Sequence, residues 1–89
     1  MQFNKIKTDL TVSELALLFR VLVDGKIVTT KQNTELFKAI AATFSSKKQD
    51  DISVNTIKNH FDTPEDKAKD NLHGKLLPLL QIAKKFKDS

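Results

Sequence analysis

The chain has 89 residues, too few to divide between two hydrophobic cores, so we expect a single helical domain covering residues 1–89. A net charge of +4, 39% hydrophobic residues and only two glycines and two prolines are typical of a folded, helix-rich protein. The chain contains no cysteine, which excludes a disulfide framework, a thiol nucleophile and a Cys-based zinc site.

The chain lacks the patterns of a membrane or secreted protein. Its most apolar window, residues 15–23, is interrupted by Arg20 and is far shorter than the roughly 20 apolar residues of a membrane span. Residues 1–9 are polar and lack the apolar segment of a secretory signal. We therefore expect a cytoplasmic protein without a membrane partner.

The first predicted helix covers residues 12–24. Thr11 and Glu14 have the spacing of a capping box, in which each side chain accepts a hydrogen bond from the other residue's backbone N–H. Gly25 is expected to end the helix in the left-handed conformation, and residues 26–29 could form a short extended stretch. Apolar side chains cover most of the circumference of this helix, which predicts a central place in the core.

Two shorter helices are predicted next. The second begins at a cap between Thr30 and Asn33 and carries a single apolar stripe. That stripe consists of Leu36, Phe37, Ile40, Ala41 and Phe44. A polar loop follows over residues 45–51, after which Ser53 caps the third helix. The inward side chains of the third helix are Val54, Ile57 and Phe61.

The fourth predicted helix is the longest. Thr63 caps it, Pro64 occupies its first position, and it continues to about Lys85 with a kink near Gly74 and Pro78. Its core-facing stripe comprises Leu72, Leu76, Leu79, Leu80, Ala83 and Phe86. The expected fold class is all-α: four helices with at most a trace of strand, in which the second and third helices form a helix-turn-helix-like pair.

The polar residues do not indicate catalysis. His60 and His73 lack the second ligand that a metal site on one helix needs, and Gly25 and Gly74 are isolated rather than part of a phosphate-binding loop. The paired carboxylates lie next to helix starts, where they compensate the helix dipole. We therefore expect no enzymatic activity, no catalytic residue, no metal and no cofactor.

Residues 52–60 carry a local resemblance to DNA readers. They read Ile-Ser-Val-Asn-Thr-Ile-Lys-Asn-His, which resembles the start of the recognition helix in LuxR-type response regulators. The resemblance implies a helix that reads DNA. Helical spacing places Asn55, Thr56 and Asn59 opposite the apolar face, with Lys58 on its flank.

A longer pattern covers residues 12–80. Its landmarks are Glu14, Leu15, Gly25, Ile27, Val28, Glu35, Leu36, Ala41 and Phe44, followed by a short helix and a Leu-rich closing helix. This order is similar to the C-terminal half of RteC-type regulators of conjugative transposons. The resemblance implies a DNA-associated regulatory module connected with mobile elements.

The leading hypothesis is a small DNA-binding module for transcription regulation, with double-stranded DNA as its partner. Amide side chains suit adenine edges and lysines suit phosphates, so the third helix would enter the major groove. The expected DNA-binding residues are Lys47, Lys48, Asn55, Thr56, Lys58 and Asn59. Three carboxylates, Asp50, Asp51 and Asp62, oppose this hypothesis because they repel phosphate.

The alternative hypothesis is a protein-interaction or homodimerisation module that does not bind nucleic acid. Leu77 and Ile82 lie off the core-facing stripe of the fourth helix, and two such apolar side chains could mark a contact with another subunit. A basic cluster lies at the end of the same helix, where compensation of the helix dipole explains its charge. This cluster consists of Lys84, Lys85 and Lys87.

Overall fold

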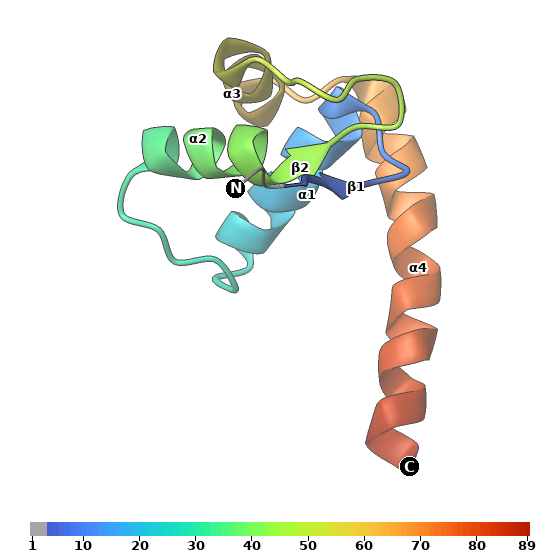
Figure 1. Ribbon diagram of the computed structural model, residues 1–89. Coiled ribbons are helices and arrows are strands. Elements are labelled where there is room, and N and C mark those ends of the chain that lie inside the picture. Colours follow the sequence, from blue (N-terminus) through green and yellow to red (C-terminus); the bar gives the residue numbers. More distant parts are fainter. Residues whose placement is uncertain (1–3) are drawn as a thin grey trace.

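The computed structural model describes residues 4–89 and is mostly helical (Figure 1). In chain order the elements are β1 (Ile6–Lys7), α1 (Val12–Asp24), α2 (Asn33–Thr43), β2 (Phe44–Ser45), α3 (Val54–Asp62) and α4 (Asp66–Asp88). Within the described residues, four helices and a minor two-stranded sheet confirm the expected all-α class with four helices. Residues 1–3, which begin the polar segment predicted to carry no secretory signal, lie outside the described residues.

The helix α1 is the central element, as predicted, because two of its sides are covered. Leu15 and Ala16 belong to the main core with side chains from α2 and α3, whereas Leu17 packs against α4. The buried partners in the main core are Leu36, Phe37, Ile40, Ile52, Ile57 and Phe61. A helix with neighbours on two sides needs apolar residues around most of its circumference, which explains the composition of α1.

The two ends of α1 compare differently with the prediction. At the start, the Glu14 N–H donates to the Thr11 hydroxyl (3.2 Å) and the Thr11 N–H donates to the Glu14 carboxylate (3.4 Å), which confirms the capping box. At the end, Gly25 has a φ of −81° and is not left-handed. The positive φ, 63°, belongs to Lys26, so the predicted left-handed glycine is wrong by one residue.

The expected extended stretch at residues 26–29 is also absent. The Lys26 N–H donates to the Val23 carbonyl (3.0 Å), and the N–H groups of Ile27 and Val28 donate to the Leu22 carbonyl (2.9 and 3.1 Å). These bonds form a Schellman-type helix end and occupy the amides that a strand would need. The strand pairing lies elsewhere, between β1 and β2, which run parallel with Ile6 opposite Phe44.

The helix α3 has the predicted start and buried face. Ile57 and Phe61 are buried, and Ser53 occupies the N-cap position, although its side chain makes no capping hydrogen bond. Arg20 of α1 fastens the other end, because its guanidinium donates to the Phe61 carbonyl (2.7 Å) and lies 5.5 Å from the centre of the Phe61 ring. The helix is thus held to α1 by apolar and polar contacts.

The helix α4 begins two residues later than predicted, with Glu65 rather than Thr63 at its N-cap. Thr63 is instead the C-cap of α3, where its N–H donates to the Asn59 carbonyl (2.9 Å). Pro64 and Glu65 therefore separate Thr63 from the first turn of α4. The helix then continues through Pro78 without interruption.

The first turns of α4 pack on α1, and the remainder leaves the rest of the molecule (Figure 1). Ala68 and Leu72 are buried against Leu17, and Leu76 is partly buried in the same cluster. All residues from 77 to 89 are exposed. The prediction that the whole apolar stripe of this helix faces the core is therefore wrong beyond Leu76.

Candidate interaction surface on the C-terminal helix

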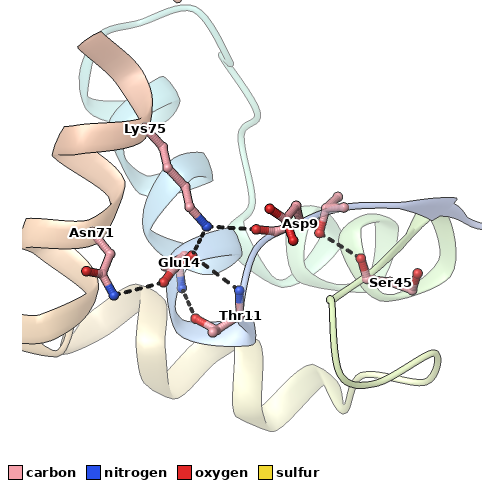
Figure 2. Close-up of polar contacts among 7 residues, drawn as sticks. Asp9, Thr11, Glu14, Ser45, Asn71 and Lys75 are labelled. Atoms are coloured by element: carbon pink, nitrogen blue, oxygen red, sulfur yellow. Dashed lines mark hydrogen bonds and ion pairs between the residues drawn. The ribbon is translucent and has the colours of Figure 1, made fainter. Parts of the chain in front are cut away.

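A buried carboxylate fastens α4 to the rest of the fold (Figure 2). The Glu14 side chain is only 3% exposed and lies between α1 and α4. The Lys75 ammonium donates to Glu14 Oε1 (2.9 Å), and the Asn71 amide donates to Glu14 Oε2 (3.3 Å). Lys75 also donates to the Asp9 carbonyl (2.7 Å). Three segments therefore meet at the point where α4 departs.

The pKa of Glu14 is lowered despite its burial. Burial raises this pKa and is the largest single influence, but the hydrogen bonds from Lys75, the Thr11 backbone and Asn71, together with the positive charge of Lys75, outweigh it. The ionised carboxylate is consequently the form that holds α4. A capping role was expected for Glu14, but nothing in the local sequence pattern indicates its second role toward Asn71 and Lys75.

Beyond this anchor, an apolar face of α4 has no cover within the described part of the chain. We call it the bare stripe: Leu79, Leu80, Ala83 and Phe86. Leu79, Leu80 and Phe86 are 53%, 68% and 76% exposed. Helical spacing puts these residues in line with Leu72 and Leu76, so the bare stripe continues the face that packs on α1.

The predicted partner-binding residues border the bare stripe. Leu77 lies three residues before Leu80, and Ile82 lies three residues after Leu79, and both are exposed. Residues at this spacing are neighbours on a helix surface. The prediction thus found the edges of an apolar surface and missed its centre, because the central residues have the spacing expected of a core-facing stripe.

The charges around the bare stripe are of one sign. Between Asp70 and Asp88 the chain carries no carboxylate, whereas the basic cluster of Lys84, Lys85 and Lys87 lies within this span. Lys84 follows Leu80 by four residues and Lys87 follows Ala83 by four, so both lysines lie beside the stripe. Residues 77–88 of α4, which we call the projecting half, therefore present apolar and cationic groups together.

The predicted DNA-binding residues of α3 lie on its outer side, with one exception. Asn55, Lys58 and Asn59 are exposed, whereas Thr56 is half-buried. The Lys58 ammonium forms an ion pair with the Asp62 carboxylate (3.3 Å). The positive charge of Lys58, which the DNA-binding hypothesis assigns to a phosphate contact, is therefore partly neutralised within α3.

The two predicted lysines of the preceding loop are also exposed. Lys48 lines a groove of about 340 Å³ beside Ser13 and Glu65, at the start of α1 and α4. The backbone N–H of Lys47 donates to the Leu10 carbonyl (2.9 Å). The connection that carries these lysines, residues 44–53, includes β2 and is longer than the three- to four-residue turn of a helix-turn-helix.

The histidines and acidic residues form no evident metal site. His60 lies near the Ser13 hydroxyl (3.2 Å) and the Glu65 carboxylate (3.7 Å). Within residues 4–89 there is no group of three or more His, Cys, Asp or Glu residues placed to hold a metal ion. His60 instead connects α3 to the start of α1 and to the residue that precedes α4.

Comparisons with protein-family models, with curated proteins and with solved structures found no match to this chain. The resemblances to LuxR-type and RteC-type regulators therefore stay predictions. In the described part of the chain, no helix has both the length and the apolar content required to cross a bilayer.

Proposed function

We propose that this chain is a protein-interaction module that displays the projecting half of α4 to another protein. The observation that carries the proposal is the bare stripe, whose leucines and phenylalanine are more than half exposed although they continue the face that packs on α1. Exposed apolar patches of this kind mark interaction sites in folded proteins. A long helix with one apolar face fits the helix-in-groove mode of recognition.

The anchor at Glu14 supports this proposal because it fixes the point from which the helix projects. Lys75, one residue before Leu76, is bonded to both the Glu14 carboxylate and the Asp9 carbonyl. The bare stripe is therefore presented on a helix whose base is held in place, and less conformational freedom is lost on binding than with a free segment.

Photo-crosslinking tests the proposal directly. A photoreactive amino acid in place of Ala83 puts the reactive group on the bare stripe, in the cells that naturally produce the protein. We expect a discrete crosslinked protein adduct, which mass spectrometry identifies. The adduct should be lost in a Leu80→Ser background, because that substitution removes a central side chain of the stripe.

The matched control is Gln81→Ser, which introduces the same residue at the adjacent, exposed position off the stripe. This control should retain the adduct. If position 83 gives no protein adduct, or if Leu80→Ser and Gln81→Ser behave alike, the bare stripe is not a docking surface and the proposal fails.

DNA binding is the second candidate function. In its more specific version, α2 and α3 form a helix-turn-helix-like pair and the chain takes part in the regulation of mobile elements. The observation in its favour is that Asn55, Lys58 and Asn59 are exposed on one short helix, with Lys47 and Lys48 exposed in the preceding loop. Amides and lysines are suitable groups for base edges and phosphates. The neighbouring carboxylates and the long connection make it the weaker candidate.

Fluorescence anisotropy of a labelled duplex tests the second candidate. Binding through phosphates must fall steeply as the salt concentration rises. Lys47→Ala combined with Lys48→Ala should weaken binding to all duplexes, whereas Asn59→Ala should change the sequence preference. Absence of binding at low salt rules this candidate out.

A further inference from the structure

We infer that the partner of the bare stripe is an acidic amphipathic helix of another protein, rather than a second copy of this chain. This inference rests on the proposed function and names the chemistry of the partner. Two features carry it: the apolar sides of α1 and α4 that continue past their mutual contact, and the single sign of charge around the bare stripe.

The first feature is an apolar side chain of α1 that lies on the side facing α4 but beyond the contact between the two helices. Glu14 and Leu17 contact α4, and Leu18 packs against the same cluster. Val21 lies one turn further along this side, at three and four residues from Leu18 and Leu17, and is 42% exposed. Both helices therefore carry apolar side chains beyond the place where they touch.

The two helices diverge beyond their contact. In Figure 1, α1 runs across the molecule whereas α4 runs away from it toward the C-terminus. A partner helix that lies along the bare stripe would contact Leu79 and Ala83 with its apolar face. An apolar stripe at three- and four-residue spacing is the pattern that such a partner requires.

The second feature is charge, which selects between possible occupants. No carboxylate occurs between Asp70 and Asp88, and two lysines of the basic cluster, Lys84 and Lys87, lie beside the stripe. A second copy offers these lysines no carboxylate: in a parallel pair the two clusters would repel each other, and in an antiparallel pair each would face the uncharged residues 77–83. A partner with Asp or Glu on both sides of its apolar stripe complements the surface, and its charges accelerate association.

Two labelled helical peptides provide the test with the intact chain. Both peptides carry the same leucine stripe, one with Glu on its flanks and the other with Lys at the same positions, and anisotropy measures their binding. We expect the Glu peptide alone to bind, with an affinity that falls as NaCl is added. Leu80→Ser should abolish binding, and Gln81→Ser should leave it unchanged.

A set of charge variants isolates the basic cluster. Lys84→Gln combined with Lys87→Gln should weaken binding of the Glu peptide about fivefold, as expected for two exposed charge pairs. The control combines Lys7→Gln with Lys31→Gln, which removes the same charge from exposed positions off α4. The control should bind like the unaltered chain.

The possible failures are distinguishable. Equal binding of both peptides overturns the acidic partner and leaves the proposed function intact. Failure of both peptides, with light scattering showing a dimer that Leu80→Ser dissociates, overturns the inference in favour of a second copy. If neither peptide binds but the chain binds vesicles of phosphatidylglycerol, a membrane surface is the partner, and both the inference and the proposed function are overturned. No binding to any probe overturns the inference, and the crosslink from position 83 then decides the proposed function alone.

Discussion

At the level of single residues, the end of α1 depends on a lysine in a conformation that favours glycine. Lys26 has a φ of 63°, and a side chain there costs roughly 1 kcal/mol relative to glycine. We expect Lys26→Gly to raise the free energy of unfolding by about 0.5–1 kcal/mol, because it relieves this cost and keeps the Schellman-type bonds. Urea denaturation at pH 7 measures the change.

Gly25→Ala provides the control at the neighbouring position. Gly25 has an ordinary negative φ, so alanine fits its backbone, and the added Cβ would lie 3.2 Å from the Val21 carbonyl oxygen. This tight contact offsets the lower entropy of the unfolded chain, and the expected net change is within about 0.5 kcal/mol. If Gly25→Ala is strongly destabilising and Lys26→Gly has no effect, the left-handed residue is Gly25 after all.

Glu14 makes the stability of the fold depend on pH. Its pKa is lower in the folded chain, so the unfolded chain binds a proton at a higher pH than the folded chain does. Its stabilising contribution is therefore complete above about pH 4.5, the ordinary value for a glutamate, and is lost as the pH falls further. Protonation of Glu14 removes the ion pair with Lys75.

Glu14→Gln tests this dependence. At pH 7 the variant should be less stable by about 1–3 kcal/mol, because a neutral amide replaces a buried carboxylate that accepts hydrogen bonds from Lys75 and Asn71. The difference between the variant and the unaltered chain should shrink below about pH 4.5, where the glutamate also becomes neutral. Denaturation curves at pH 7, 5 and 3 measure it, and a difference that stays constant would refute the role of the charge.

At the level of secondary-structure elements, the sequence predicts what local interactions determine. The bounds of α1 and the start of α3 follow from capping residues and apolar spacing, and both agree with the structure. The start of α4 does not, because whether Thr63 completes α3 or begins α4 depends on the path of the chain. The pairing of β1 with β2 joins distant segments and has no local signal.

The bare stripe shows a different limit of prediction. The spacing of apolar residues along α4 predicts that one face of the helix is buried against other residues. Leu72 and Leu80 both lie on this face, so the spacing makes the same prediction for both. The spacing does not indicate whether this chain supplies the cover. In the structure α1 covers the face only as far as Leu76, so the same pattern produces a core contact in one half and an exposed surface in the other.

Pro78 should lower the local stability of the projecting half of α4 without affecting the global stability of the fold. Proline removes the backbone hydrogen bond that residue 78 would donate to the Gly74 carbonyl, and it weakens a helix interior. We expect Pro78→Ala to slow amide exchange of residues 79–85 about tenfold or more, while global stability changes by less than about 0.5 kcal/mol. Hydrogen exchange followed by NMR measures the first, and urea denaturation the second.

The reference amides for this experiment lie in α1, around Leu15 and Ala16, which are buried in the main core. Their exchange should be the same in Pro78→Ala and in the unaltered chain. An equal gain in protection for α1 and for the projecting half would mean that the two regions unfold together, contrary to the expectation.

At the level of the whole molecule, the shape is less compact than its length requires. The radius of gyration is 13.7 Å, whereas a chain of this length folded into a compact domain is expected to have about 12 Å. The projecting half of α4 accounts for the difference in Figure 1. The part that folds around α1 and the part that is displayed are therefore separate regions of one chain.

Truncation at two positions tests this division. A chain that ends at Leu77 loses only exposed residues, so its free energy of unfolding should stay within about 1 kcal/mol of the full chain. The denaturant slope should also change little, because the deleted residues expose little additional surface on unfolding.

A chain that ends at Glu65 instead loses Ala68, Leu72 and the partners of Glu14, and should be destabilised by several kcal/mol. Urea denaturation compares both with the full chain. If the shorter deletion costs as much as the longer one, the bare stripe is covered by this chain in solution, and neither the docking surface nor its acidic partner would be tenable.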